Sequence, residues 1–144
     1  MADPFTTATL ADADPERFHR LRADLGVESF GINQLVLEPG QRMRIHRHER
    51  QEEVFLVLAG RLTIAFEDGE RDFEVGQLVR IAPEVRRQML NRGPGRLSLL
   101  CIGGYGDRHE PRDAEGFRDW DDEPRAIRDV PNPDDLPASE LRSS

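Results

Sequence analysis

The sequence predicts an all-β domain of the sandwich or barrel type. Two observations carry this prediction. The middle of the chain contains many short apolar segments, and turn residues such as Gly, Pro and Asp-Gly separate most of them. Many short strands divided by such turns are typical of β-sandwiches and β-barrels. The length of 144 residues fits one domain and leaves little room for a second.

Residues 1–28 are predicted to form a loose arm and a short helix. The Asp-Pro pair at 14–15 favours a helix start, because Asp caps the free N–H groups and Pro is preorganised for the first turn. Gly26 is a typical helix end. Three apolar residues between these signals share one helical face: Phe18, Leu21 and Leu25.

Eight strands are predicted within the barrel region, residues 29–106. Their approximate ranges are 29–37, 41–48, 52–58, 61–66, 71–75, 78–82, 86–91 and 96–102. In the third strand, Phe55 and Val57 share one face. The opposite face is also apolar, with Val54, Leu56 and Leu58. A barrel interior covers only one of these faces, so we expect a homodimer or a flanking segment to cover the other.

Residues 107–144 are predicted to form an extended C-terminal strap. They contain 12 acidic residues, six arginines and five prolines, a composition that cannot build a core of its own. Their large apolar residues are spaced like anchors: Phe117, Trp120, Ile127, Val130 and Leu136. The sequence leaves open whether the strap crosses its own barrel or a neighbouring chain.

The composition excludes several classes of function. All 20 basic residues are arginine, which rules out Schiff-base chemistry on lysine and a lysine-containing phosphate loop. The net charge of −8 disfavours nucleic acid and anionic membranes as partners. The single cysteine, Cys101, excludes an internal disulfide, and the N-terminus has no apolar secretion signal. We therefore expect a cytoplasmic protein.

Two histidines and a glutamate are the candidate metal ligands. His46 and His48 are two residues apart, which places both imidazoles on the same face of a strand. Glu53 opens the next strand and reaches the same point if that strand returns beside the first. Two imidazoles and one carboxylate are a donor set suited to Fe(II) or Mn(II), and also to Zn(II) or Ni(II).

These residues also carry a resemblance to a known family. Gly40, His46, His48, Glu53 and Gly60 match every position of the first cupin motif, G-x(5)-H-x-H-x(3,4)-E-x(6)-G. The resemblance implies a small β-barrel of jelly-roll type, which is usually a dimer, and a small-molecule site inside the barrel. Cupins include metal-dependent oxygenases, isomerases and decarboxylases, metal-free epimerases and binding modules, so the family leaves the reaction open.

The second cupin motif is present with one substitution that affects the chemistry. Gly76 opens it, Pro83 stands one place late and Asn91 closes it. Four residues before Asn91, where the family has its third metal histidine, this sequence has Arg87. A guanidinium stays protonated and cannot ligate a cation. Carried over by position, the metal ligands are therefore His46, His48 and Glu53, and we expect any divalent metal to be held weakly.

Three interpretations of Arg87 are open. In the first, three ligands hold a metal, and Arg87 faces an anionic substrate at the open metal positions. In the second, Arg87 occupies the place of the metal and pairs with Glu53 in a metal-free or non-catalytic binding protein. In the third, the site is vestigial and Arg87 is structural. The first interpretation corresponds to a metal-dependent oxygenase or isomerase acting on an acidic or oxygen-rich compound.

Three further residues are candidates for substrate binding together with Arg87. Arg44 lies two residues before His46, so on an unbroken strand it faces the same side, where two arginines could hold a carboxylate or phosphate. Phe55 and Met89 share a strand face with Glu53 and Arg87, respectively. They are expected as walls of the site, although ordinary filling of the barrel explains them equally well.

Overall fold

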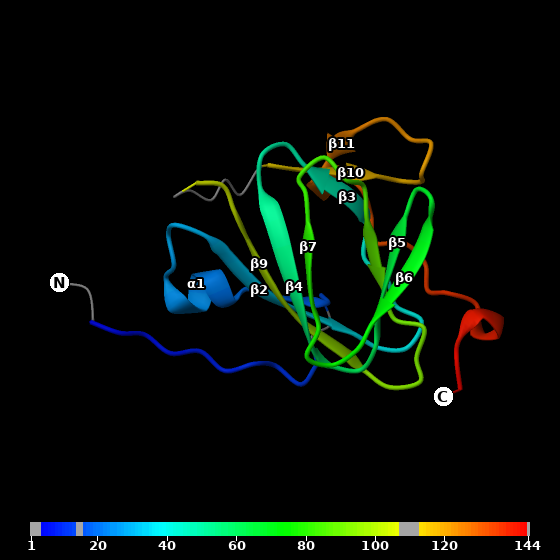
Figure 1. Cartoon of the computed structure of the whole chain (residues 1–144), viewed down its shortest axis with the longest axis horizontal. Helices are drawn as coiled ribbons and strands as arrows, with labels where there is room; N and C mark the ends of the chain where they lie inside the picture. Colours follow the sequence, from blue (N-terminus) through cyan, green and yellow to red (C-terminus); the bar gives the residue numbers. More distant parts are fainter. Residues whose placement is uncertain (1–3, 14–15, 107–112, 144) are drawn as a thin grey trace.

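The strands are arranged as the two facing layers of a flattened barrel (Figure 1). This computed structural model describes residues 4–13, 16–106 and 113–143. One layer is a five-stranded sheet. In spatial order its strands are β1 (Phe18–His19), β2 (Gly31–Leu37), β9 (Leu97–Gly104), β4 (Glu52–Ala59) and β7 (Leu78–Ile81). All of the pairings in this layer are antiparallel.

The second layer is built from two three-stranded sheets that isolated backbone bridges connect. One contains β11 (Arg125–Ala126), β10 (Ala114–Phe117) and β3 (Ile45–His48). The other contains β6 (Gly69–Phe73), β5 (Leu62–Phe66) and β8 (Gln88–Leu90). The bridges pair His46 with Arg87 and Arg42 with Leu90. Each of the eight predicted strands corresponds to one of β2–β9, and the all-β barrel is confirmed.

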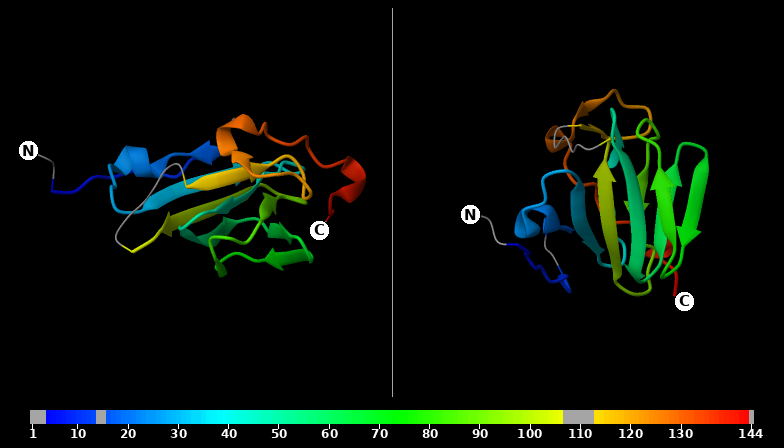
Figure 2. Two further views of the ribbon diagram at one scale, coloured as in Figure 1. Left: turned by 90° about the horizontal axis from the view of Figure 1, so that it is seen from above. Right: turned by 60° about the vertical axis from the view of Figure 1, so that its left-hand side comes forward.

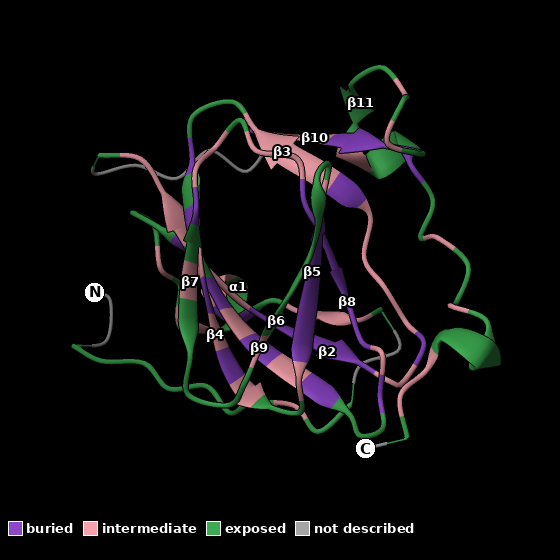
Figure 3. Cartoon of the chain, turned by 45° about the vertical axis from the view of Figure 1, so that its right-hand side comes forward, coloured by how far each residue is buried: buried purple, intermediate pink, exposed green. Residues whose placement is uncertain are grey.

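The core lies between the two layers, and the alternation of side chains along the strands produces it. Along β4, Phe55 and Val57 are buried, while Val54, Leu56 and Leu58 on the opposite face are half-buried. Buried stretches of β2, β4, β5 and β9 line the interior in Figure 3. The core cluster consists of Leu35, Leu37, Phe55, Val57, Leu62, Ile64, Ile81, Met89, Leu97, Leu99 and Cys101.

Gly60, the last residue of the first motif, turns the chain between β4 and β5. Its φ of +79° lies in the left-handed region, which favours glycine. A Cβ atom at this position would clash with the backbone carbonyl of Arg96. The glycine is therefore required both by the conformation of the turn and by the close approach of a second backbone segment.

The N-terminal helix is shorter than predicted. Helix α1 spans Leu21–Leu25 and ends at Gly26, whose φ is +73°. The prediction that Phe18 belongs to this helix is wrong, because Phe18 lies in β1 opposite Leu35 of β2. Pairing with the otherwise open edge of β2 outweighs the helical periodicity here. The predicted helix start at 14–15 lies outside the described residues. None of the helices described is long and apolar enough to cross a membrane.

The C-terminal segment packs against the barrel of its own chain. Strand β10 pairs with β3 over four residues, from Ala114 opposite His48 to Phe117 opposite Ile45. The segment then follows the right-hand side of the barrel in Figure 1 and crosses over it in the left view of Figure 2. Phe117 and Val130 are buried at 1% and 2% exposure. They are the two predicted anchors that the structure buries most completely.

The contacts of Phe117 explain how an acidic segment is held. The guanidinium of Arg86 lies over its ring at 4.0 Å from the centroid, and that of Arg47 lies at 5.3 Å. These are cation–π distances. Arg86 also donates a hydrogen bond to the carbonyl of Trp120 at 3.0 Å.

We predict that Phe117→Ala lowers the free energy of unfolding by about 3–5 kcal/mol, because it removes a fully buried aromatic side chain. Phe5→Ala is the matched control, since Phe5 is 76% exposed and should change stability by less than about 0.5 kcal/mol. Urea denaturation of the three proteins measures both values. Equal stability of the two variants would contradict the anchoring role of Phe117.

Candidate metal centre

The predicted metal ligands come from two neighbouring parts of the barrel. His46 and His48 lie on β3, and the intervening Arg47 points the other way, toward Glu115 of β10. Glu53 lies on β4, on the same inward face as Phe55. The turn between β3 and β4 brings these strands close enough for the three side chains to meet.

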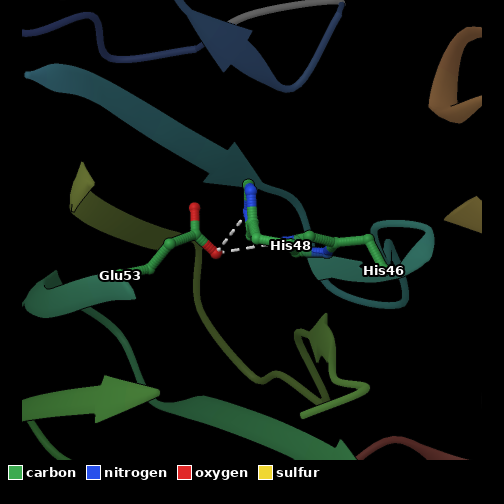
Figure 4. A group of neighbouring side chains, drawn as sticks. All are labelled: His46, His48 and Glu53. Atoms are coloured by element: carbon green, nitrogen blue, oxygen red, sulfur yellow. Dashed lines mark hydrogen bonds and ion pairs between the residues drawn. The ribbon is translucent and has the colours of Figure 1, made fainter. Parts of the chain in front are cut away.

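The three ligand atoms converge on one point (Figure 4). The Nε2 atoms of His46 and His48 each lie 3.1 Å from Oε1 of Glu53. All three ligand atoms lie within 4.8 Å of one another. The imidazole rings stand edge to face, with centroids 5.2 Å apart. The three side chains are 11–14% exposed.

The environment of His48 fits a metal better than a hydrogen bond. Neither ring nitrogen of His48 has a hydrogen bond of good geometry, although both are buried. Nε2 lies close to Glu53 Oε1, but the angles of this contact are not those of a hydrogen bond. Two atoms that ligate one metal at about 2.1 Å are about 3.0–3.4 Å apart for right-angled to tetrahedral geometry. Both distances to Glu53 Oε1, 3.1 Å each, agree with this spacing, and the donor set of two imidazoles and one carboxylate suits a divalent metal.

Arg87 lies at the same cluster and is completely buried. His46 and Arg87 form a backbone bridge, in which each N–H donates to the carbonyl of the other residue at 3.0 Å. This pairing places the guanidinium beside the histidines. Arg87 Nη2 lies 2.5 Å from Glu53 Oε1, the oxygen that both histidines approach. The side chain of Arg87 has no exposed surface.

The other terminal nitrogen of Arg87 binds the loop before β8. Nη1 donates to the carbonyl of Val85 at 2.7 Å and to that of Pro83 at 3.1 Å. The guanidinium therefore connects this loop to Glu53. The substrate-binding role predicted for Arg87 stays a prediction, and the contacts described here are with protein groups.

Burial and hydrogen bonding set the protonation of the cluster. Burial alone would raise the pKa of Glu53. The adjacent imidazoles of His46 and His48 outweigh this effect and hold that pKa well below its ordinary value. Burial lowers the pKa of His46, which favours the neutral imidazole that metals bind. Burial, followed by the charge of Glu53, raises the pKa of Cys101 well above its ordinary value. Its buried Sγ donates to Glu53 Oε2 at 3.3 Å.

The remaining predicted binding residues lie in different surroundings. Arg44 Nε donates to the carbonyl of Val130 in the C-terminal segment. Burial, followed by the charge of Arg17, lowers the pKa of Arg44. Phe55 and Met89 are 1% and 0% exposed and belong to the core cluster. Their predicted roles in binding substrate stay predictions.

Asp113, at the start of the C-terminal segment, also touches the cluster. Its Oδ2 lies 3.3 Å from Nδ1 of His48, and its side chain is only 2% exposed. Sequence reasoning did not single out this residue, because it is one of 12 acids in its segment and belongs to neither motif. Its closeness to His48 follows only from the pairing of β10 with β3, which the sequence did not predict.

We predict that Glu53→Gln lowers the free energy of unfolding by about 3–5 kcal/mol, because it leaves the buried charge of Arg87 without its partner. It should also flatten the acid limb of the stability profile. A carboxyl with a lowered folded-state pKa stabilises the fold above its unfolded pKa, and that stabilisation is lost as the pH falls through the folded value.

Thermal melts between pH 7 and pH 3 test both effects. Stability of the natural protein should fall as the pH drops below about 4.5, and more steeply than that of Glu53→Gln. Glu52→Gln is the control, since Glu52 is half-exposed and pairs with Arg80. Parallel profiles for all three proteins would contradict this account of Glu53.

Comparison with solved structures identifies relatives of the same fold. A cupin protein from Bacteroides fragilis superposes with a TM-score of 0.65, at 20% identity over 76% of this chain and 91% of its own. A sugar phosphate isomerase from the cupin superfamily of Silicibacter pomeroyi gives 0.57, at 23% identity over 85% and 81%. A putative sugar phosphate isomerase from Acidithiobacillus ferrooxidans gives 0.59, at 21% identity over 79% and 78%.

These sequence identities are too low to transfer a reaction to this chain. The structural similarity establishes the fold alone. No curated protein matches the sequence. Residues 33–103, from β2 almost to the end of β9, match the sequence profile of the Cupin domain. The matched region contains both motifs and all three candidate ligands. The barrel, the motifs and this match together show that the chain belongs to the cupin family.

Proposed function

We propose that this cupin binds a divalent transition metal through His46, His48 and Glu53 and uses it to hold an acidic or oxygen-rich small molecule. One observation carries the proposal: Nε2 of His46 and of His48 each lie 3.1 Å from the same oxygen of Glu53, and Nε2 of the buried His48 has no hydrogen bond there. Fe, Mn, Zn and Ni all suit this donor set. A bound metal would act as a Lewis acid on an oxygen of the ligand.

The charges around the cluster support an anionic ligand. Without metal, Glu53 and Arg87 neutralise each other. A divalent ion with neutral histidines would bring these groups to a charge of about +2, or about +1 when the Asp113 carboxylate beside His48 is counted. If the family's third histidine stood in place of Arg87, the site would carry one positive charge fewer. An anion at the open metal positions offsets the excess, so metal and anion should each strengthen the binding of the other.

The reaction class is an oxygenase or an isomerase. The names of two fold relatives supply only the first compounds to test, since their sequence identities are below 25%. Sugar phosphates combine an anionic group with several hydroxyl oxygens and so match the proposed ligand chemistry. Aldose and ketose phosphates and simple dicarboxylates form the first panel.

A metal-free binding protein is the second candidate, and the Arg87–Glu53 contact favours it. The guanidinium lies 2.5 Å from the oxygen that a metal would use and already neutralises that carboxylate. In this alternative Arg87 stands in for the metal, and the cluster binds its ligand through hydrogen bonds.

The outer face of the five-stranded sheet supports a homodimer. Leu56 and Leu58 on this face are half-buried, and Leu78, opposite Leu56, is 64% exposed. Ile102 is 38% exposed opposite Val54. An apolar face of this kind is typical of protein–protein contacts. A cytoplasmic location, expected from the single cysteine, stays a prediction.

We predict that sedimentation at micromolar concentration gives about twice 16.4 kDa. Leu78→Arg should shift the protein toward the monomer by placing charges in the apolar contact. Phe5→Arg is the control, because Phe5 is exposed on the N-terminal arm. A monomeric natural protein would contradict the homodimer.

We predict that the natural protein binds metal weakly, and that Arg87→His tightens binding by about tenfold or more, because it adds a fourth donor and removes a charge. Arg87→Gln removes the charge, together with the contacts to Pro83 and Val85, without adding a metal donor, as Arg87→His does. The proteins are purified without chelator or nickel resin, analysed for metals, and titrated calorimetrically with Mn(II), Fe(II), Zn(II) and Ni(II).

The outcomes separate the two candidates. Binding by the natural protein that tightens when a panel anion is present supports the proposed metal site. Tight binding by Arg87→His alone supports the alternative in which Arg87 replaces the metal. Failure of all three proteins to bind any of the four metals overturns the metal proposal. Near-ultraviolet circular dichroism checks that each variant keeps the packed barrel.

A further inference from the structure

Asp113 lies between the barrel and the C-terminal segment, immediately before β10. The position is outside residues 33–103, the region that matches the Cupin domain profile. Its side chain is nevertheless among the least exposed of the charged groups described, at 2%. A carboxylate is buried this deeply only where several donors satisfy it.

The donors come from the turn that joins β3 to β4. Asp113 Oδ1 accepts the backbone N–H of Arg50 at 3.0 Å, and Oδ2 accepts that of Gln51 at 2.9 Å. The backbone carbonyl of Asp113 accepts the N–H of Glu49 at 3.1 Å. This turn is the only covalent path between His48 and Glu53, so holding its backbone fixes the spacing of these two ligands.

The same carboxylate faces His48 from the side opposite the metal position. Oδ2 lies 3.3 Å from His48 Nδ1, and His48 Nε2 lies 3.1 Å from Glu53 Oε1. A neutral imidazole carries one N–H. A metal at Nε2 requires that proton on Nδ1, the nitrogen that faces Asp113, whereas without a metal Nε2 faces the nearer carboxylate of Glu53. Carboxylates that accept from the outer nitrogen of a ligating histidine orient the ring and increase its basicity.

We propose that Asp113 is a positioning residue of the metal centre, which makes the C-terminal segment part of the site. It holds the β3–β4 turn through backbone N–H groups and places a carboxylate beside Nδ1, the nitrogen that carries the His48 proton when Nε2 ligates a metal. The inference rests on the proposed metal function for its effect on metal affinity. Its effect on the β3–β4 turn is independent of any metal.

Two variants of Asp113 and one control test the affinity. Asp113→Asn keeps the shape and part of the hydrogen bonding, and Asp113→Ala removes both. Glu115→Gln is the matched control, because Glu115 lies in β10, two residues away, and pairs with Arg47 instead of the cluster. Calorimetric titration with Zn(II) and Mn(II) should show about 10–100-fold weaker binding in the Asp113 variants. The control should stay within about twofold of the natural protein.

Nitrogen-15 NMR of the histidine side chains gives the second readout, which does not depend on the variants folding. In the natural protein with Zn(II), His48 Nδ1 should carry a proton. An unprotonated Nδ1 in the Zn(II) form overturns the proposal, as does unchanged metal affinity in both Asp113 variants. If the natural protein binds no metal, the proposed function fails, and amide hydrogen exchange then decides the role of Asp113: the Arg50 and Gln51 N–H groups should exchange faster in Asp113→Ala and at an unchanged rate in Glu115→Gln, and equal rates in all three proteins overturn it.

Discussion

The buried carboxylate of Glu53 imposes the main constraint on this barrel. A charge placed inside a protein must be matched by donors or by an opposite charge, or it destabilises the fold by several kcal/mol. Here one oxygen is shared by His46, His48 and Arg87, and the other accepts from Cys101. The strands that carry these groups are therefore held to one another by polar contacts as well as by the apolar core.

Arg87 changes the electrostatics of an otherwise familiar donor set. Where the family has a third histidine, the arginine neutralises Glu53 and also binds the carbonyls of Pro83 and Val85. The charge of Glu53 is thereby balanced without an ion. A cation that enters must share Glu53 with the guanidinium, which leaves an excess of positive charge at the cluster. In the proposed function an accompanying anion offsets this excess, so the affinity for the cation depends on that anion.

Sequence reasoning predicted the parts of the fold that depend on local chemistry. Gly and Pro turns separate most of the strands from β2 to β9, and the convergence of His46, His48 and Glu53 follows from strand parity and one turn. Strands β1, β10 and β11 were not predicted, because each has two to four residues and pairs with an edge that another segment supplies. Phe18 shows the same effect, since its helical spacing is overridden by pairing with β2.

The pairing of β3 with β10 has a consequence for the order in which the molecule is assembled. Arg47 and Glu115, which form an ion pair across these strands, are separated by 68 positions along the chain. Closing so long a loop is entropically costly and gains little until the barrel already exists. During synthesis, the segment that completes β3 leaves the ribosome after the whole barrel region. The histidine-bearing strand is therefore an open edge on the nascent chain, and its final geometry is reached among the last steps of folding.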